Sequence, residues 1–365
     1  ELLDFEIKAI EEDMWHILVP TYRVDVTRDV DVAEELLRIY GFNEVPVPDQ
    51  MRISVAVHDP RPEKIERSVL DQLTGNGFYE IMNNSLAKGT DYTALLPEVS
   101  ASLIEMLNPL SLDLNVMRNN LLFGGLQSIS FNQKRQQPNL RFFERGKTYG
   151  KGSNGYYENV QLDLFAAGAQ GEEYWDSRSQ PNDYFWMKGL LESLFERLGL
   201  SVSSTTAQHS LYGEYVVFKS GKSTIGCLGT VHPKVLKHFD IKGAVVHTSI
   251  NWDQCKNLLL QRGASLFNNL PKFPSVRRDI ALLVDRSEQY QNLQDCILQV
   301  GKGLLINVFL FDVYDGDKLP ADKKSYAIGM IFQDANKTLN DKAVDKTVQR
   351  IVDQLNKRTG AVLRQ

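Results

Sequence analysis

The spacing of apolar residues divides the chain into segments of different character. Helical spacing of Ile65, Val69 and Leu73 predicts a helix over 62–75, and the apolar run that follows at 78–86 predicts a strand. Further along this middle segment, strand-like stretches come in runs, with helices set between them. Strict alternation of strand and helix is absent, which predicts an antiparallel α+β layer and not a doubly wound sheet.

The C-terminal segment has a more regular pattern. Strand-like and helical stretches follow one another in the order strand–helix–strand–strand–helix–strand, which is the ferredoxin-like split βαβ plan. The last helix is predicted to have Asn340 as its N-cap and to end before Gly360. Its predicted inner face consists of Ala343, Val344, Thr347, Ile351 and Leu355.

The N-terminal segment is short and holds a predicted strand over 16–20 and a helix. The helix is expected to take Asp29 or Asp31 as its cap and to stop at Gly41. Its apolar stripe consists of Val32, Leu36 and Ile39.

The three patterns together predict an α+β chain in three parts. These parts are a partial N-terminal module over 1–48, an antiparallel core over 49–264 and a ferredoxin-like domain over 272–365. With fewer than 50 residues, the first part is too small to form a stable hydrophobic core alone.

Composition is ordinary for a globular protein and agrees with this division. The 365 residues suit two or three domains, with 42% hydrophobic and 24% charged residues. No apolar run approaches the roughly 18 residues that span a bilayer. The three cysteines form no zinc or redox spacing, which favours a reducing, cytoplasmic setting. The first residues are acidic and lack Met, so they form no signal peptide and suggest the cut end of a longer chain.

Charge is unevenly spread, although the whole chain carries a net charge of only -5. From Lys272 onward there are 15 Lys and Arg against 12 Asp and Glu, whereas the preceding part has 26 against 34. The C-terminal domain is therefore the part expected to meet a polyanion such as RNA, beside aromatic residues such as Phe273 and Tyr326. Solvated surface is the alternative interpretation of its basic residues. The candidate RNA-binding residues are Arg277, Arg278, Lys323, Lys324, Lys337, Arg358 and Arg364.

An acidic cluster lies in the stretch YRVDVTRDVDVAEELLRIYGF, with Asp25, Asp31, Glu34 and Glu35 near the start of the predicted helix. Acids at a helix N-terminus gain about 0.3–1 kcal/mol each from the dipole, and Glu34 can also pair with Arg38. From spacing alone, this helix-end interpretation is preferred. Converging carboxylates repel, however, by roughly 4 kcal/mol per pair at 4 Å and an effective dielectric of ~20. A hard cation such as Mg²⁺ is therefore the alternative.

Signatures of catalysis are otherwise absent from the sequence. It contains no P-loop, no dinucleotide-binding glycine motif, no H-E-x-x-H and no G-x-S-x-G. His232 precedes a proline at the start of a predicted short helix, and a capping role is favoured for it over a catalytic one.

Several stretches resemble the β-subunit family of bacterial phenylalanyl-tRNA synthetase. VPTYRVDVTRDVDVAEELLRIYGFNEVPVP is similar to the end of the small module before the family's core. LNVMRNNLLFGGLQSISFNQKRQQPNLRFFERGKTY and GCLGTVHPKVLKHFDIKG are similar to the core itself, and KFPSVRRDIALLVD is similar to the anticodon-binding domain. The resemblance extends over essentially the whole chain in the family's own order.

The resemblance implies a part in a class II aminoacyl-tRNA synthetase. Such an enzyme is an (αβ)₂ heterotetramer that joins phenylalanine to tRNA(Phe) with ATP and Mg²⁺, and its α subunit holds the catalytic and ATP sites. The β core is expected to keep the class II fold without catalysis. FFERG at 142–146 agrees, because Glu144 precedes Arg145 and the Arg-x-Glu order of the second class II motif is lost. This chain alone is therefore expected to be inactive.

The resemblance also changes the interpretation of the acidic cluster. The family's pattern R-x-D followed by D-x-x-E-E occurs here as Arg23 to Asp25 and Asp31 to Glu35. It implies that Asp25, Asp31, Glu34 and Glu35 bind a Mg²⁺ shared with the α subunit, and that the basic residues of the last domain face tRNA. The rival hypothesis is a metal-stabilised scaffold, derived from a synthetase, without a role in tRNA binding.

Overall fold

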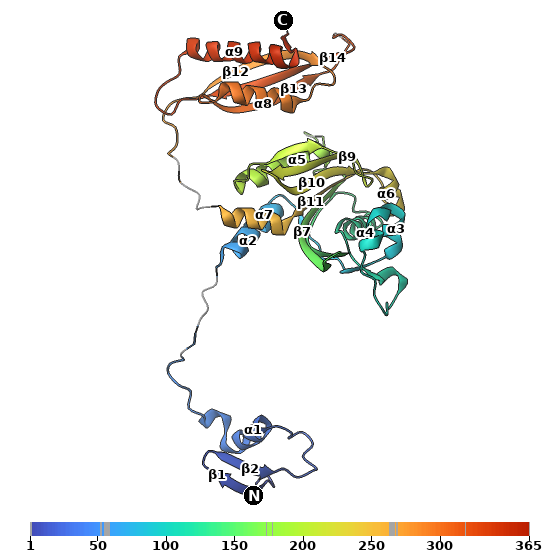
Figure 1. Cartoon of the computed structure of the whole chain (residues 1–365), viewed down its shortest axis with the longest axis vertical. Coiled ribbons are helices and arrows are strands. Elements are labelled where there is room, and N and C mark those ends of the chain that lie inside the picture. Colours follow the sequence, from blue (N-terminus) through green and yellow to red (C-terminus); the bar gives the residue numbers. More distant parts are fainter. Residues whose placement is uncertain are drawn as a thin grey trace. The chain divides into compact units, whose positions relative to one another are not determined.

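The computed structural model of the chain (Figure 1) describes residues 2–51, 53–54, 59–172, 174–176, 178–262, 267, 269–317 and 319–364. It divides into two compact units, Glu1–Arg262 and Gly263–Gln365. None of the helices found in these residues is both long and apolar enough to cross a membrane.

The N-terminal part of the first unit contains a hairpin of β1 (Glu6–Glu11) and β2 (Met14–Leu18), followed by α1 (Asp29–Tyr40) and the 3-10 turn η1 (Phe42–Glu44). The N-cap of α1 is Arg28, so the expected cap at Asp29 or Asp31 was wrong by one or three residues. Gly41 ends the helix as predicted.

The predicted apolar stripe of α1 is not part of a core. Within residues 2–51, Leu3 and Val26 have the only buried hydrophobic side chains, and Leu36 and Ile39 are each 47% exposed. A two-stranded hairpin offers too little apolar surface to bury the stripe.

The centre of the first unit is a seven-stranded sheet in which the described neighbours pair antiparallel, except β3 with β6. The predicted antiparallel layer is thus confirmed. The strands in order across the sheet are β3 (Tyr79–Glu80), β6 (Leu140–Gly152), β7 (Gly155–Ala167), β11 (Val245–Asn251), β10 (Ser223–Val231), β9 (Tyr212–Ser220) and β8 (Ser203–Thr206).

Helices cover both faces of this sheet (Figure 1). Successive residues of β7 point to opposite faces, so Leu164 packs in one core and Phe165 in the other. The core of Leu164 also receives α2 (Arg61–Gly75), α5 (Tyr184–Arg197) and α7 (Trp252–Gln261). The core of Phe165 receives α3 (Gly89–Leu95), α4 (Leu122–Gln133) and α6 (Pro233–His238). Shorter elements complete the unit: β4 (Leu86–Ala87), β5 (Val116–Met117), and the 3-10 turns η2 (Pro97–Ser102) and η3 (Leu112–Leu114).

Helix α4 lies directly on the middle of the sheet. A Cβ atom at Gly125 would lie 2.1 Å from the ring of Phe165, so only glycine permits this approach. At the start of α6, His232 accepts a hydrogen bond from the backbone N–H of Lys234 (3.2 Å), which confirms its predicted capping role.

The predicted strand over 78–86 was mostly wrong. Only Tyr79–Glu80 and the start of β4 are extended and paired. Between them, the backbone N–H and the side-chain amide of Asn83 both donate to the carboxylate of Glu144. Ile81 still donates its backbone N–H to Phe143 of β6, but from Asn83 the hydrogen bonds go to a side chain instead of a neighbouring strand.

The second unit has the ferredoxin-like order predicted for it. Its antiparallel sheet has the strand order β13-β14-β12-β15, and both helices contribute to one core beneath it. The elements in chain order are β12 (Val276–Asp285), α8 (Tyr290–Gly301), β13 (Leu305–Tyr314), β14 (Lys323–Phe332), α9 (Asp341–Thr359) and β15 (Val362–Leu363). Asn340 caps α9 and Gly360 ends it at φ +68°, as expected. Of the predicted inner face, Ala343 alone is exposed.

Candidate nucleic-acid interface and acidic cluster

One face of the C-terminal sheet is left uncovered by its two helices. On β12, Ile280, Leu282 and Val284 alternate into the core with α8 and α9, so the residues between them point to the other face. We call this other face the open face. Its members that matter below are Arg277, Phe309, Phe311, Tyr314, Lys323 and Arg364, placed by strand register or by contact with one another.

The aromatic rings of the open face form two arginine–aromatic groups. The guanidinium carbon of Arg277 lies 5.2 Å from the ring centre of Phe309 and 5.3 Å from that of Phe311, and the two ring centres are 6.3 Å apart. In the second group, Arg364 lies 4.9 Å from the ring centre of Tyr314. Such rings can stack with bases, and the cations near them can neutralise phosphates.

A glycine on the neighbouring strand allows the ring of Phe309 to lie against the sheet. Phe309 is opposite Gly329 across the β13–β14 ladder, and a Cβ atom there would be 2.5 Å from the ring. The ring therefore lies against the sheet, while the side chain of Phe311 remains 48% exposed.

The seven predicted RNA-binding residues do not share one face. Arg277, Lys323 and Arg364 are on the open face, where Lys323 also pairs with Asp285 at 2.6 Å. Arg278 points to the helical side, with its guanidinium bound to Asp341 (2.5 Å) and Asp345 (3.0 Å) on α9.

The remaining three basic residues are also elsewhere. Lys324 lies over the ring of Tyr326, which is buried on the helical side, and Arg358 of α9 donates to Gln299 of α8 at 2.7 Å. Lys337 is exposed in the loop before α9. Sequence reasoning missed Phe309, Phe311 and Tyr314, although their positions in the predicted strand were a usable signal.

The acids of the N-terminal segment are bound by arginines. Both side-chain oxygens of Asp31 are engaged: one accepts from the guanidinium of Arg28 at 2.8 Å, and the other from the backbone N–H groups of Thr27 (3.0 Å) and Arg28 (2.8 Å). The Arg28 guanidinium and the Thr27 N–H hold the pKa of Asp31 well below its usual range. Asp31 is thus the capping-box acid of α1.

Glu35 is bound by two arginines at one oxygen. Arg38 and Arg23 each donate to Oε2 at 2.7 Å, and in that order they lower the pKa of the Glu35 carboxyl. The expected pairing of Arg38 with Glu34 was therefore wrong. Glu34 is exposed, and the side chain of Asp25 is 70% exposed with the Nε of Arg23 3.9 Å away.

The acidic side chains of this cluster are of the type that binds magnesium, but in the described part of the chain they do not lie close enough together to form a complete site. Four carboxylates are suitable oxygen donors for Mg²⁺. Within the described residues, however, no three His, Cys, Asp or Glu side chains lie close enough together to hold a metal ion. Two of the four predicted ligands, Asp31 and Glu35, are occupied by arginines instead.

Family models match three successive parts of the chain. Residues 1–42 match the tRNA synthetase B5 domain, 50–252 match the phenylalanyl tRNA synthetase beta chain CLM domain, and 271–364 match the ferredoxin-fold anticodon binding domain. The CLM model alone covers more than half of the residues. The chain belongs to the phenylalanyl-tRNA synthetase β-chain family.

Curated relatives of this β chain carry the same family name. The chain is 37% identical to the phenylalanine–tRNA ligase beta subunit of Bacteroides fragilis over 98% of its own length and 46% of the relative. It is 36% identical to that of Porphyromonas gingivalis over 99% and 46%. The chain therefore spans about half the length of the curated relatives it matches.

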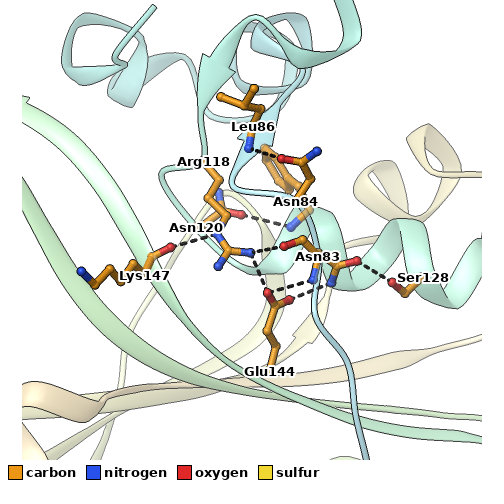
Figure 2. A network of polar contacts seen from close by, with 9 residues as sticks. Asn83, Asn84, Leu86, Arg118, Asn120, Ser128, Glu144 and Lys147 are labelled. Carbon is orange, nitrogen blue, oxygen red and sulfur yellow. Dashed lines mark hydrogen bonds and ion pairs between the residues drawn. The ribbon is translucent and has the colours of Figure 1, made fainter. Parts of the chain in front are cut away.

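The CLM part of the β chain contains a buried ion pair (Figure 2). Arg118 and Glu144 are 8% and 1% exposed, and their side chains meet at 2.6 Å. Arg118 also donates to the backbone oxygens of Lys147 (2.8 Å) and Asn83 (3.1 Å), and Ser128 donates to the side-chain oxygen of Asn83 at 2.8 Å. The network connects the segment after β3, the stretch after β5, α4 and β6.

Two arginines of β6 are also held by contacts within the protein. Arg145 pairs with Glu66 of α2 at 2.9 Å. Arg141 donates to the carbonyl oxygens of Asn76 and Gln170 and lies 4.6 Å from the ring centre of Trp186. With Arg118 held by Glu144, each of these three cations has its partners within the protein.

Proposed function

We propose that this chain is the non-catalytic β-subunit portion of phenylalanine–tRNA ligase. In this role it supports a catalytic α subunit and binds tRNA(Phe) during ATP-dependent aminoacylation. The observation that carries the RNA role is the group formed by Arg277, Phe309 and Phe311 on the open face. The family name of the relatives supports the role in the ligase, together with the anticodon-binding model over 271–364.

The open face binds unpaired nucleotides through two kinds of contact. Bases stack on Phe309 and Phe311, because every base offers a flat π-face to an aromatic ring. Arg277 and Arg364 lie over the rings and neutralise phosphates of the same strand, for which Arg277 has to exchange its exposed partner Asp279 (2.8 Å).

The ATP and amino-acid chemistry belongs to the α subunit. The arginines near β6 are bound to Glu144, Glu66 and backbone carbonyls, so they are not free to bind a triphosphate. Helix α4 also fills the middle of one sheet face. The chain works in the cytoplasm as part of an (αβ)₂ heterotetramer, and aminoacylation by the purified chain alone would contradict this division of labour.

Binding of tRNA(Phe) to the full chain is expected to weaken steeply with salt. If Arg277, Lys323 and Arg364 neutralise about three phosphates, affinity falls about 20-fold between roughly 50 and 200 mM salt. Fluorescence anisotropy with labelled tRNA(Phe) measures this, and a tRNA of another specificity serves as the control. The rival scaffold hypothesis requires that no tRNA binds even at low salt, with the catalytic subunit present or absent.

The magnesium ion is proposed to bind at Asp25, Asp31, Glu34 and Glu35 in the assembled enzyme. A bound divalent cation would take carboxylate oxygens as ligands and would connect them to ligands of the α subunit. Asp31, the fourth acid of the family pattern, holds the helix start on which Glu34 and Glu35 lie.

Glu34→Gln is expected to weaken divalent-cation binding by about tenfold, because one anionic ligand is lost. Titration of the αβ assembly with Mn²⁺, followed by electron paramagnetic resonance, measures the change. Glu44→Gln provides the control, because Glu44 is an acid of the same segment that lies outside the cluster. Equal affinities of wild type and Glu34→Gln would argue against Glu34 as a ligand.

A further inference from the structure

A group of exposed cations lies where the end of α4 meets the loop after α6, in the first unit. Two hydrogen bonds join these elements: the Gln133 amide donates to the Lys242 carbonyl (2.9 Å), and the Lys242 backbone N–H donates to the Gln133 side-chain oxygen (3.0 Å). The next residue, Lys134, pairs with Asp240 of the same loop at 3.0 Å. These contacts bring the cations of both elements onto one surface, which we call the basic patch. Its members are Lys134, Arg135, Lys234, Lys237 and Lys242, and all five are exposed.

Two of these lysines come from α6. Lys234 and Lys237 are three positions apart, so they share one side of the helix. The carbonyl oxygen of Lys237 accepts the backbone N–H of Asp240 (3.2 Å), so the end of α6 lies beside the partner of Lys134. The helix therefore extends the basic patch.

Arg135 is held in a fixed position within the patch. Its guanidinium carbon lies 3.4 Å from the ring centre of Phe131, and its Nη1 donates to the carbonyl oxygen of Phe131 at 3.0 Å. The ring of Phe131, one turn earlier on α4, is 55% exposed. A guanidinium that is already placed loses less conformational freedom when it binds, and its planar donors match the oxygens of a phosphate.

The charge of the patch is opposite to that of its surroundings. The part of the chain before Lys272 has 26 Lys and Arg against 34 Asp and Glu. In the patch, by contrast, five cations face two acids, namely Asp240 and Glu214, which lines a hollow of about 640 Å³ beside Lys237. Among the residues that the structure describes, Lys134 is the only member of the patch with an ion pair. The other four cations are therefore available to a polyanion.

We propose that the basic patch is a second RNA-binding surface of the chain, which contacts the sugar–phosphate backbone of the bound tRNA. This inference rests on the RNA role proposed above. Exposed lysines and a stacked arginine neutralise phosphates without reading bases. The hollow beside Lys237 has Pro233, Leu236 and Ile241 in its wall and gives room for an unstacked base next to these phosphates. An acidic protein surface would match the charges alone, whereas a nucleotide matches both the charges and the apolar hollow.

The contact is tested by the triple variant Lys234→Ala, Lys237→Ala, Lys242→Ala in the full chain. If each lysine neutralises one phosphate, the slope of log affinity against log salt should become shallower by roughly 2–3. The affinity ratio of wild type to variant should then shrink roughly 20-fold between about 50 and 200 mM salt. Anisotropy titrations with labelled tRNA(Phe) measure this, and the loss should be equal with a tRNA of another specificity, because backbone contacts carry no sequence information. These contacts add to those of the open face and steepen the salt dependence of the wild type.

The triple variant Lys151→Ala, Lys219→Ala, Lys222→Ala is the matched control. These lysines are also exposed, and they lie near the turns of the β6–β7 and β9–β10 hairpins. The hollow beside the patch is lined by Gly213, at the other end of β9. The control should keep the affinity and salt dependence of the wild type. Equal weakening in both triple variants would show an effect of net charge alone and would overturn the proposal.

Asp240→Asn is expected to act in the opposite direction. It removes the acid that pairs with Lys134, and both side chains of this pair are more than half exposed. Asp240 has φ +55°, a conformation that asparagine also adopts readily, so the melting temperature should not change. With Lys134 released, tRNA should bind about fivefold tighter at roughly 100 mM salt, with a slope steeper by about one contact. Damage to the fold cannot produce such a gain.

Two further outcomes separate this proposal from the one on which it rests. Unchanged affinity and salt dependence in the Lys234, Lys237 and Lys242 variant would overturn the basic patch as an RNA contact, and an acidic protein surface would become the expected partner. Failure of the wild-type chain to bind any tRNA at low salt, alone and with the α subunit, would instead refute the RNA role of the chain itself.

Discussion

Glu144→Gln is expected to lower the free energy of unfolding of the first unit by about 3–5 kcal/mol, the range for breaking a buried ion pair. The substitution keeps the size of the side chain but removes its charge, so Arg118, 8% exposed, is left as an unbalanced cation. In the wild-type protein the side-chain amide of Asn83 donates to Glu144 at 2.7 Å. The substitution places a second amide at this position. Urea unfolding followed by tryptophan fluorescence measures the loss, because all four tryptophans, the buried Trp252 among them, belong to the first unit.

Two comparisons make this expectation specific. Glu158→Gln removes an ion pair in the same β6–β7 hairpin, where Lys147 and Glu158 meet at 2.5 Å but are 50% and 54% exposed. It should lower the free energy of unfolding far less than Glu144→Gln does, because solvent screens an exposed pair. The double variant Arg118→Met with Glu144→Leu should be less destabilised than Glu144→Gln, because no charge stays buried. Similar losses of unfolding free energy for Glu144→Gln and Glu158→Gln would show that burial of an ion pair does not determine how much it contributes to stability.

Phe311→Ala is expected to weaken binding of tRNA(Phe) by roughly 5- to 150-fold, which corresponds to the loss of one stacked base at about 1–3 kcal/mol. Phe311 is 48% exposed, so folding should change little. Arg277→Ala should weaken binding as well and reduce the salt dependence by about one phosphate contact. Anisotropy titrations of the full chain at several salt concentrations measure both quantities.

Arg278→Ala is the matched control for the open face. It removes the same charge one residue along the chain, but from the helical side, where Arg278 binds Asp341 and Asp345. It should lower the stability of the C-terminal unit and leave most of the tRNA affinity intact. If Arg278→Ala weakens binding as much as Phe311→Ala, the open face is not the RNA-binding surface.

The fold could be predicted from sequence largely because periodicity determines element type. The repeat of Val69 and Leu73 identified α2, and Asn340 and Gly360 marked both ends of α9 correctly. The pattern was least informative where side chains replace backbone partners. Asn83 gives its hydrogen bonds to Glu144, a residue 61 positions away, and local sequence does not reveal such a partner.

The candidate RNA site was harder to predict, because it depends on which residues share a face. Adjacent residues of a strand point to opposite faces, so Arg277 and Arg278 could not act together, and alternation alone could have separated them. The placement of Phe309 and Phe311 near Arg277 required the pairing of β12 with β14 and of β14 with β13, including an irregularity between Leu310 and Asp312.

The acidic cluster illustrates another limit of sequence reasoning. Spacing correctly placed acids at the start of α1, but it did not identify which cation each one binds. Arg28, Arg23 and Arg38 lie three, twelve and three positions from their acids, and only the observed side-chain directions assign Arg38 to Glu35.

The order of strands in the core sheet has a consequence for the newly made chain. β7 has β11 as one of its neighbours, and the buried hydrogen bond between His247 and Asp163 joins residues 84 positions apart. At roughly 5–20 residues per second, the ribosome needs several seconds to add β11 after β7 has been made. During that time one edge of the β6–β7 hairpin has no partner strand, and exposed edges of this kind invite aggregation. We therefore expect this edge of the hairpin to be open to pairing with another chain until residue 251 has emerged.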